Sequence, residues 1–209
     1  MSRHGIIVPL LGGLWALVSV RAASAPATEN SSFEADRYAK WPGYSRQHDG
    51  AMTGWRATGG AGVNPIWKDP DNQRGPDSPF HDNGRVPDGK QLAFIQGPGT
   101  INQVIDGFER GRRYVVTYRE NARVQRQGTA WPRLRVALGG QVIVSPHEVV
   151  PVAKRNDFSV PFYRVESGAF AAPGDGRYEL IFETIQDSPT TTVMIDDIRI
   201  RDATDEAPE

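Results

Sequence analysis

The sequence predicts an all-β domain with the architecture of a β-sandwich or jelly roll. The 209-residue chain carries 22 glycines and 16 prolines, a turn-rich composition that favours short strands over long helices. Its apolar residues fall into short runs at regular spacing, several with the period of two that is typical of strands. The sequence holds no window with the apolar stripe of an amphipathic helix.

The expected strands begin at residue 91. Gly and Pro occur at many positions in residues 36–90, so we interpret this stretch as loops. Gly139–Gly140 separates two apolar runs and is a hairpin signal. We predict eight or more strands, within residues 91–96, 100–105, 114–118, 134–138, 142–144, 158–165, 178–185 and 191–200.

The first residues have the layout of a secretory signal peptide. A short basic start is followed by an uncharged, mostly apolar run over 6–20 and by small residues over 21–25. We therefore predict a signal peptide over 1–25, cleaved between Ala22 and Ala25, a β-sandwich domain over 26–201 and an acidic flexible tail over 202–209. The expected location is secreted, periplasmic or at the cell surface, with no membrane span after cleavage.

Cysteine content and charge exclude several classes of function. The chain has no cysteine and a formal net charge of −1. The lack of cysteine rules out a disulfide scaffold, thiolate-ligated zinc, iron–sulfur clusters and thiol catalysis. Nucleic acids and anionic membranes attract proteins through positive charge, so we expect no nucleic-acid partner.

Four short motifs stand in a recognisable order. They are Asn30–Glu34, Gly54–Trp55, Gln103–Phe108 with the later Gly111 and Tyr114, and Val193–Ile198. Together they resemble the galactose-binding-like jelly roll of carbohydrate-binding modules and related secreted bacterial domains. The resemblance covers about residues 30–201. It implies a jelly-roll β-sandwich of two antiparallel sheets, with Trp55 as a core residue.

A calcium site is expected where the ends of the domain meet. The first and last strands of a jelly roll lie side by side, which brings Glu34 near the Asp196–Asp197 pair. Converging carboxylates repel one another unless a proton or a cation intervenes, and calcium prefers oxygen ligands. The resemblance also implies a structural calcium here. Neighbouring strand residues face opposite sides, and we favour Glu34 and Asp197 as ligands; the alternative is a surface carboxylate beside Arg199 or Arg201.

Candidate ligand-binding residues come from two loop regions. Trp41 and Trp67 stand in polar loops, where an exposed indole can stack on a sugar ring. The cluster His81, Asp82, Asn83 and Arg85 can supply polar contacts at the rim of a sandwich. Each has an alternative interpretation: core packing for the tryptophans and ordinary turn formation for the polar cluster.

Recognised catalytic motifs are missing from the sequence. It has no nucleophile elbow, zinc-protease motif, phosphate loop or dinucleotide fingerprint. We therefore expect a secreted, monomeric, non-catalytic β-sandwich that binds carbohydrate or a cell-surface glycan. Two alternatives stay open: a structural or adhesive envelope protein that binds another protein, and a small hydrolase that uses the carboxylates around Asp82–Asp88.

Overall fold

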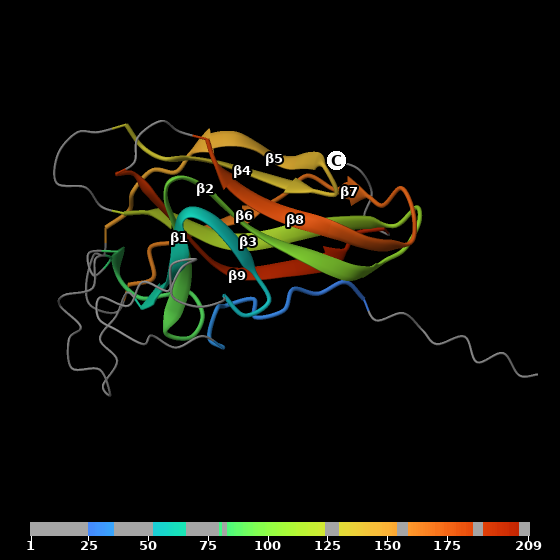
Figure 1. Cartoon of the computed structure of the whole chain (residues 1–209), viewed down its shortest axis with the longest axis horizontal. Helices are drawn as coiled ribbons and strands as arrows, with labels where there is room; N and C mark the ends of the chain where they lie inside the picture. Colours follow the sequence, from blue (N-terminus) through green and yellow to red (C-terminus); the bar gives the residue numbers. More distant parts are fainter. Residues whose placement is uncertain are drawn as a thin grey trace, which may run out of the picture.

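The computed structural model describes residues 25–35, 52–65, 80, 83–123, 130–153, 159–185 and 190–204. As the sequence predicts, the fold in these ranges is all-β (Figure 1). No helix in them is long or apolar enough to cross a membrane. The strands are β1 (Arg56–Pro65), β2 (Gln91–Phe108), β3 (Arg113–Ala122), β4 (Arg133–Leu138), β5 (Gln141–Glu148), β6 (Tyr163–Glu166), β7 (Phe170–Ala171), β8 (Gly176–Thr184) and β9 (Thr192–Asp202).

The strands form one strongly curled antiparallel sheet. Hydrogen bonding runs in the order β5-β4-β8-β2-β9-β3-β6, with β1 added on β2 and β7 on β3. The sheet folds over on itself, so that its two halves make the two layers of a sandwich (Figure 1). The two antiparallel sheets expected from the sequence are thus continuous, because β2 carries the hydrogen bonding from one layer into the other.

β2 changes layer at a glycine-rich corner. Its residues 93–96 pair with β9, and its residues from Gly99 onward pair with β8. On the neighbouring strand β1 the register shifts between Gly59 and Gly60. Gly59 has a φ of 66°, and a Cβ there would lie 2.2 Å from the carbonyl oxygen of Pro98. The close approach of the two backbones at the corner therefore requires glycine.

Gly59→Ala should destabilise the fold more than a glycine substitution in open space. The matched control is Gly140→Ala, since Gly140 has a φ of 82° and a Cβ there meets nothing within 4 Å. Both variants incur the left-handed backbone cost of about 1–2 kcal/mol. The overlap with Pro98 should lower the free energy of unfolding of Gly59→Ala by about 1–3 kcal/mol more. Denaturant unfolding measures both, and equal losses would contradict a tight corner.

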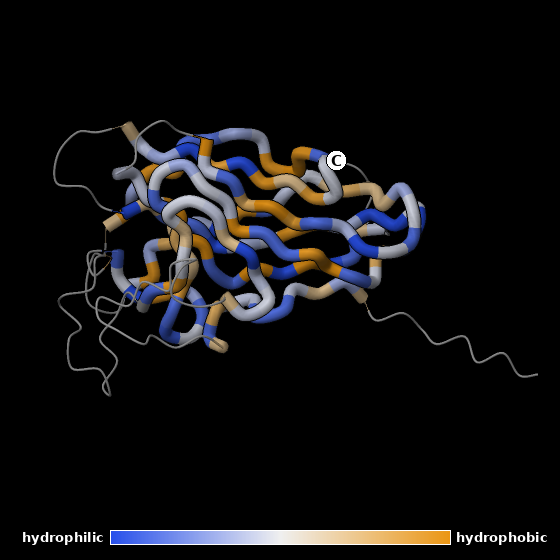
Figure 2. The backbone as a smooth tube through the Cα atoms, in the orientation of Figure 1, coloured by the Kyte–Doolittle hydropathy of each residue, from blue (hydrophilic) through white to orange (hydrophobic). Residues whose placement is uncertain are grey.

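An aromatic core fills the space between the layers. The ring of Trp55 lies 5.5 Å from that of Phe33 and 6.3 Å from that of Phe182, and Phe182 meets Tyr118 edge-on at 5.0 Å. Trp55 is only 5% exposed, which confirms the expected core tryptophan. Apolar and polar residues alternate along the strands (Figure 2). The aromatic core thus joins the N-terminal segment that contains Phe33 to both layers of the sandwich.

Some element boundaries differ from those predicted. The predicted strands 91–96 and 100–105 are the two halves of β2. The stretch interpreted as loops contains β1, a glycine-rich strand with low intrinsic propensity that pairs with β2 along its length. β6 starts at Tyr163, later than the predicted strand 158–165, and ends at Glu166, one residue after it. β9 extends past the expected domain end at 201, because Asp202 pairs with Tyr114; residues 205–209 lie outside the described ranges.

Candidate ligand-binding site

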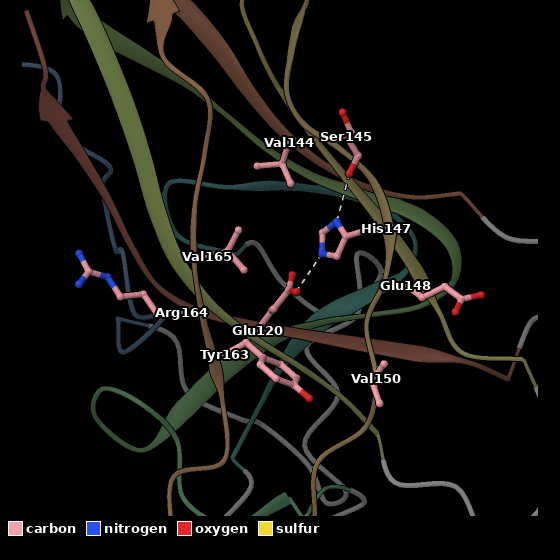
Figure 3. A pocket seen from close by; sticks show the side chains of 9 residues that line it. All are labelled: Glu120, Val144, Ser145, His147, Glu148, Val150, Tyr163, Arg164 and Val165. Atoms are coloured by element: carbon pink, nitrogen blue, oxygen red, sulfur yellow. Dashed lines mark hydrogen bonds and ion pairs between the residues drawn. The ribbon is translucent and has the colours of Figure 1, made fainter. Parts of the chain in front are cut away.

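A groove of about 520 Å³ lies where the two ends of the curled sheet face each other. β5 and β6 end the hydrogen-bonded strand order, and both contribute to the groove (Figure 3). One backbone hydrogen bond spans this gap, from the Gly168 N–H to the Ile143 carbonyl oxygen at 2.8 Å. The lining residues are Glu120 from β3, Val144, Ser145, His147, Glu148 and Val150 from β5 and its continuation, and Tyr163, Arg164 and Val165 from β6.

Glu120 places a carboxyl group at the buried side of the groove. β3 alternates, so Tyr118, Glu120 and Ala122 share the face that points into the sandwich. The Glu120 side chain is only 5% exposed. Its Oε1 contacts His147, whereas its Oε2 is buried without a hydrogen-bond partner in the described part of the chain. A buried carboxylate oxygen without a partner is costly.

His147 reaches Glu120 from the opposite layer. It lies opposite Leu134 in the ladder between β5 and β4, and this places its ring toward the core side of β5. The ring Nε2 lies 2.8 Å from Glu120 Oε1, and Nδ1 lies 3.1 Å from the Ser145 carbonyl oxygen. Figure 3 shows both contacts. We call these two residues the Glu120–His147 pair.

The two contacts of the imidazole determine where protons lie. A carbonyl oxygen only accepts hydrogen bonds, so Nδ1 carries a proton. The contact between Nε2 and Oε1 holds one further proton, shared between the ring and the carboxyl group. The hydrogen bond to Glu120 raises the pKa of His147 above its ordinary value. The pair therefore keeps this proton to a higher pH than a solvated histidine does.

Tyr118 adds a second buried polar group next to the pair. Its hydroxyl is buried. Burial raises the pKa of Tyr118 above its ordinary value, and the charge of Glu120 and a side-chain hydrogen bond to Glu120 raise it further. The phenol therefore stays protonated, and Glu120 is the group beside its O–H.

The rim of the groove is aromatic and aliphatic. Tyr163 is 44% exposed and Val150 is 36% exposed. In Figure 3 the side chains of Glu148 and Arg164 point away from the gap on opposite sides, whereas Glu120 and His147 point into it. The groove thus combines an exposed ring, aliphatic walls and one pair formed by a buried acid and a partly exposed imidazole.

Of the residues predicted to bind a ligand, the structure describes Asn83 and Arg85. Trp41, Trp67, His81 and Asp82 lie outside the described residues. Asn83 is fully buried, and its side-chain amide donates to the Ala122 carbonyl oxygen at 2.7 Å. Asn83 therefore fixes its turn against β3 and offers nothing to a ligand. Arg85 is exposed, and its backbone N–H donates to the Ser159 carbonyl oxygen.

The expected meeting of the two chain ends is confirmed. The Ile198 N–H donates to the Ser31 carbonyl oxygen at 3.1 Å. Glu34 Oε1 accepts from the N–H groups of Lys90 and Gln91, each at 2.7 Å. Asp196 Oδ2 accepts from the N–H of Asp88 at 2.9 Å. Glu34 and Asp196 therefore converge on the same segment, residues 88–91.

Asp196, rather than Asp197, faces this segment. Asp197 forms an ion pair with Arg199 at 2.6 Å, which corresponds to the surface alternative. Asp196 is fully buried, its Oδ1 has no partner in the described ranges, and burial raises its pKa to about 8. A carboxyl group with this pKa holds a proton at neutral pH unless a cation displaces it. The described residues bring no three acidic or histidine side chains together, so calcium would need main-chain or water oxygens as well.

The groove residues were not among the sequence candidates. Glu120 carried one usable signal, because it is a charged residue at an inward position of an alternating run. His147 and Tyr163 carried none, since their importance arises from the meeting of β5 with β3 and β6, which are far apart in the sequence.

Comparisons with known proteins identify structures with a similar fold. No family model matches the sequence, and no curated protein matches it. Among solved structures, a cyclase from Fischerella sp. TAU in complex with 4-(1H-indol-3-yl)butan-2-one aligns over 86% of this chain and 97% of its own, with a TM-score of 0.58 and 17% identity. The Stig cyclase Fisc from the same source aligns over 84% and 96%, with a TM-score of 0.57 and 17% identity.

A carbohydrate-binding module has a similar structure. TmCBM61 in complex with β-1,4-galactotriose aligns over 86% of this chain and 99% of its own, with a TM-score of 0.52 and 12% identity. At these identities the similarity concerns the fold. The chain has the galactose-binding-like jelly-roll fold, which carbohydrate-binding modules and Stig cyclases share.

Proposed function

We propose that this protein is an exported module that binds carbohydrate in the groove between β5 and β6. The main support is the combination of an exposed Tyr163 ring with the Glu120–His147 pair in one groove. Export is supported by the signal-like pattern of residues 1–25. At the level of the fold, the similarity to a module solved with a galactotriose supports the same class of ligand.

The chemistry of the groove suits a sugar. A pyranose ring has apolar C–H faces that pack against an aromatic ring, and hydroxyls that need directed hydrogen bonds. Tyr163 can supply the first, with Val144 and Val165 as walls, and the Glu120–His147 pair can supply the second. A volume of about 520 Å³ lies in the range of small-molecule sites.

Tyr163→Ala should weaken oligosaccharide binding at least about tenfold, the size expected for a stacking contact plus its buried area. The matched control is Trp131→Ala, because Trp131 is an equally exposed aromatic residue (46%, against 44% for Tyr163) that does not line the groove. A glycan array selects the oligosaccharide, and titration calorimetry measures the Kd. Equal binding by both variants, or no glycan bound by the wild type, would refute the assignment.

A second candidate function is catalysis at the same groove. The Glu120–His147 pair is an acid–imidazole arrangement of the kind used in proton transfer, and Stig cyclases share the fold. Turnover would appear as conversion of the oligosaccharide by the wild-type protein during the binding measurements, followed by NMR. Capture of an envelope protein without any glycan bound would instead favour the adhesive alternative.

We also propose a structural calcium near residues 88–91, with Asp196 as the ligand in place of the expected Asp197 and with Glu34 on the other side. The supports are the orphaned Oδ1 of Asp196 and the convergence of both carboxylates on one segment.

A further inference from the structure

The part of β5 that lines the groove is fixed by backbone hydrogen bonds at its two ends. At one end the Gly168 N–H donates to the Ile143 carbonyl oxygen at 2.8 Å, across the gap. At the other end the Asn121 side chain accepts from the Val152 N–H and donates to the Val152 carbonyl oxygen, each at 2.9 Å. Residues 144–150 span the distance between these two fixed points.

Between these points β5 is loosely bound to its ladder partner β4. The register of the ladder shifts on both sides of Val136, and Pro146 has no N–H to donate. Most of the β5 residues are half-buried or exposed. A segment with few ladder hydrogen bonds and little buried surface opens locally at a small cost in free energy. In the described part of the chain, the Glu120–His147 pair is the hydrogen bond that holds this segment against β3 (Figure 3).

This hydrogen bond depends on the protonation of the imidazole. Nδ1 donates to the Ser145 carbonyl oxygen, so the proton lost as the pH rises is the one between Nε2 and Glu120 Oε1. Without that proton, a nitrogen lone pair and an ionised oxygen face each other 2.8 Å apart, and neither can donate. The neutral ring must therefore leave Glu120 or turn away from Ser145.

We propose that the Glu120–His147 pair is a pH-dependent latch on the groove, which holds residues 144–150 against β3 while the imidazole is protonated and releases them when it is neutral. The inference rests on the proposed function, because it assigns a regulation to the same groove. Release leaves the His147 Nε2 available to accept from a sugar hydroxyl. The imidazole is within reach of a ligand, since its side chain is 32% exposed, against 5% for Glu120.

The direction of the pH dependence follows from the pKa of His147. The hydrogen bond to Glu120 raises this pKa above its ordinary value. A raised pKa means that the pair stabilises the closed groove fully below the ordinary histidine value of about 6.5, and that this contribution is lost as the pH rises through the raised value. The latch is therefore closed in mild acid and open in mild base.

Other charged and titratable groups surround the pair on several strands. They are Tyr118 on β3, Glu148 on β5, Arg133 opposite Glu148 on β4, Tyr163 and Arg164 on β6, and Asp196 on β9, beside the Ile195 that pairs with Glu120. Asp196 has a pKa of about 8 and changes charge in the same pH range. The overall stability therefore mixes two titrations, and the test needs a readout at the groove itself.

The test is hydrogen exchange of the Gly168 amide, followed by NMR without any sugar. The wild type is compared with Glu120→Gln at the same pH, so that the intrinsic exchange chemistry cancels. A glutamine amide can donate to a neutral Nε2 and accept from a protonated one, so this variant stays closed at both pH values. At pH 9 the Gly168 amide of the wild type should exchange about threefold to tenfold faster than that of the variant, the value of one hydrogen bond.

Two controls accompany this measurement. At pH 6 the wild type should exchange no faster than the variant. The Gly97 amide, which donates to the Thr191 carbonyl oxygen at 2.8 Å at the β2 corner, should exchange equally in both proteins and reports any general loss of stability. Should Glu120→Gln fail to fold, His147→Gln takes its place, because its amide donates to Glu120 at every pH.

The outcomes separate the latch from the proposed function. Wild-type exchange at pH 9 that is no faster than that of the variant overturns the latch, whether or not a glycan binds. The expected exchange ratio without any bound glycan on the array supports the latch, and the proposed function then fails. For a glycan that does bind, the association rate should rise from pH 6 to pH 9 in the wild type and stay level in Glu120→Gln; a level rate in both would refute the regulation of the groove.

Discussion

Phe182→Ala is expected to lower the free energy of unfolding by about 3–5 kcal/mol, the usual cost of emptying a buried aromatic site. Phe182 is fully buried on β8, and its ring contacts Trp55 and Tyr118. These contacts join the 52–55 turn and β3 of the opposite layer to β8. Truncation therefore leaves a cavity at the centre of the sandwich.

Urea unfolding at equilibrium measures this effect. The control is Trp131→Ala, a truncation of similar size at a half-exposed residue, which should cost less than about 1 kcal/mol. A loss for Phe182→Ala no larger than that of the control would mean that the layers do not pack through this ring.

Calcium is expected to raise the melting temperature, and chelation to lower it. At a calcium concentration about one hundred times the Kd, binding to the folded state alone adds about 2.7 kcal/mol of stability. The binding energy comes from Asp196, whose buried Oδ1 has no other partner in the described ranges. Asp196→Asn should therefore abolish the calcium response. Differential scanning calorimetry in calcium and in EDTA measures it.

The neighbouring carboxylate provides a matched control. Asp197→Asn removes a charge one residue away whose ion-pair partner is the exposed Arg199, and it leaves the Asp196 carboxyl group in place, so the calcium response should persist. An unchanged melting curve of the wild type in EDTA would refute the site. Loss of the response in Asp197→Asn, with Asp196→Asn unaffected, would restore the assignment made from the sequence.

Local patterns in the sequence were sufficient for the fold class. The alternation that ends in Ile198 and Ile200 predicted β9, and Gly139–Gly140 predicted the turn between β4 and β5. β1 escaped prediction because its glycines have no strand preference and its structure comes from pairing with β2. The choice between Asp196 and Asp197 depended on which side of β9 faces the 88–91 segment, and no local pattern encodes that.

The candidate site was harder to predict for the same reason. Glu120 and His147 are 27 residues apart, and they meet because the ends of the sheet order come together. A sequence pattern can mark Glu120 as a charged residue at an inward position, but it cannot identify the residue with which Glu120 pairs. Sequence reasoning placed recognition in aromatic loops, most of which lie outside the described residues.

The continuity of the sheet has a mechanical consequence. The sheet is curled into an open cylinder, with β2 in the middle of the strand order and the gap between its end strands, β5 and β6, on the open side. The angle at the β2 corner contributes to the separation of β5 and β6, which the hydrogen bond between Gly168 and Ile143 also limits. The glycines at the corner therefore help to set the width of the groove, although none of them lines it.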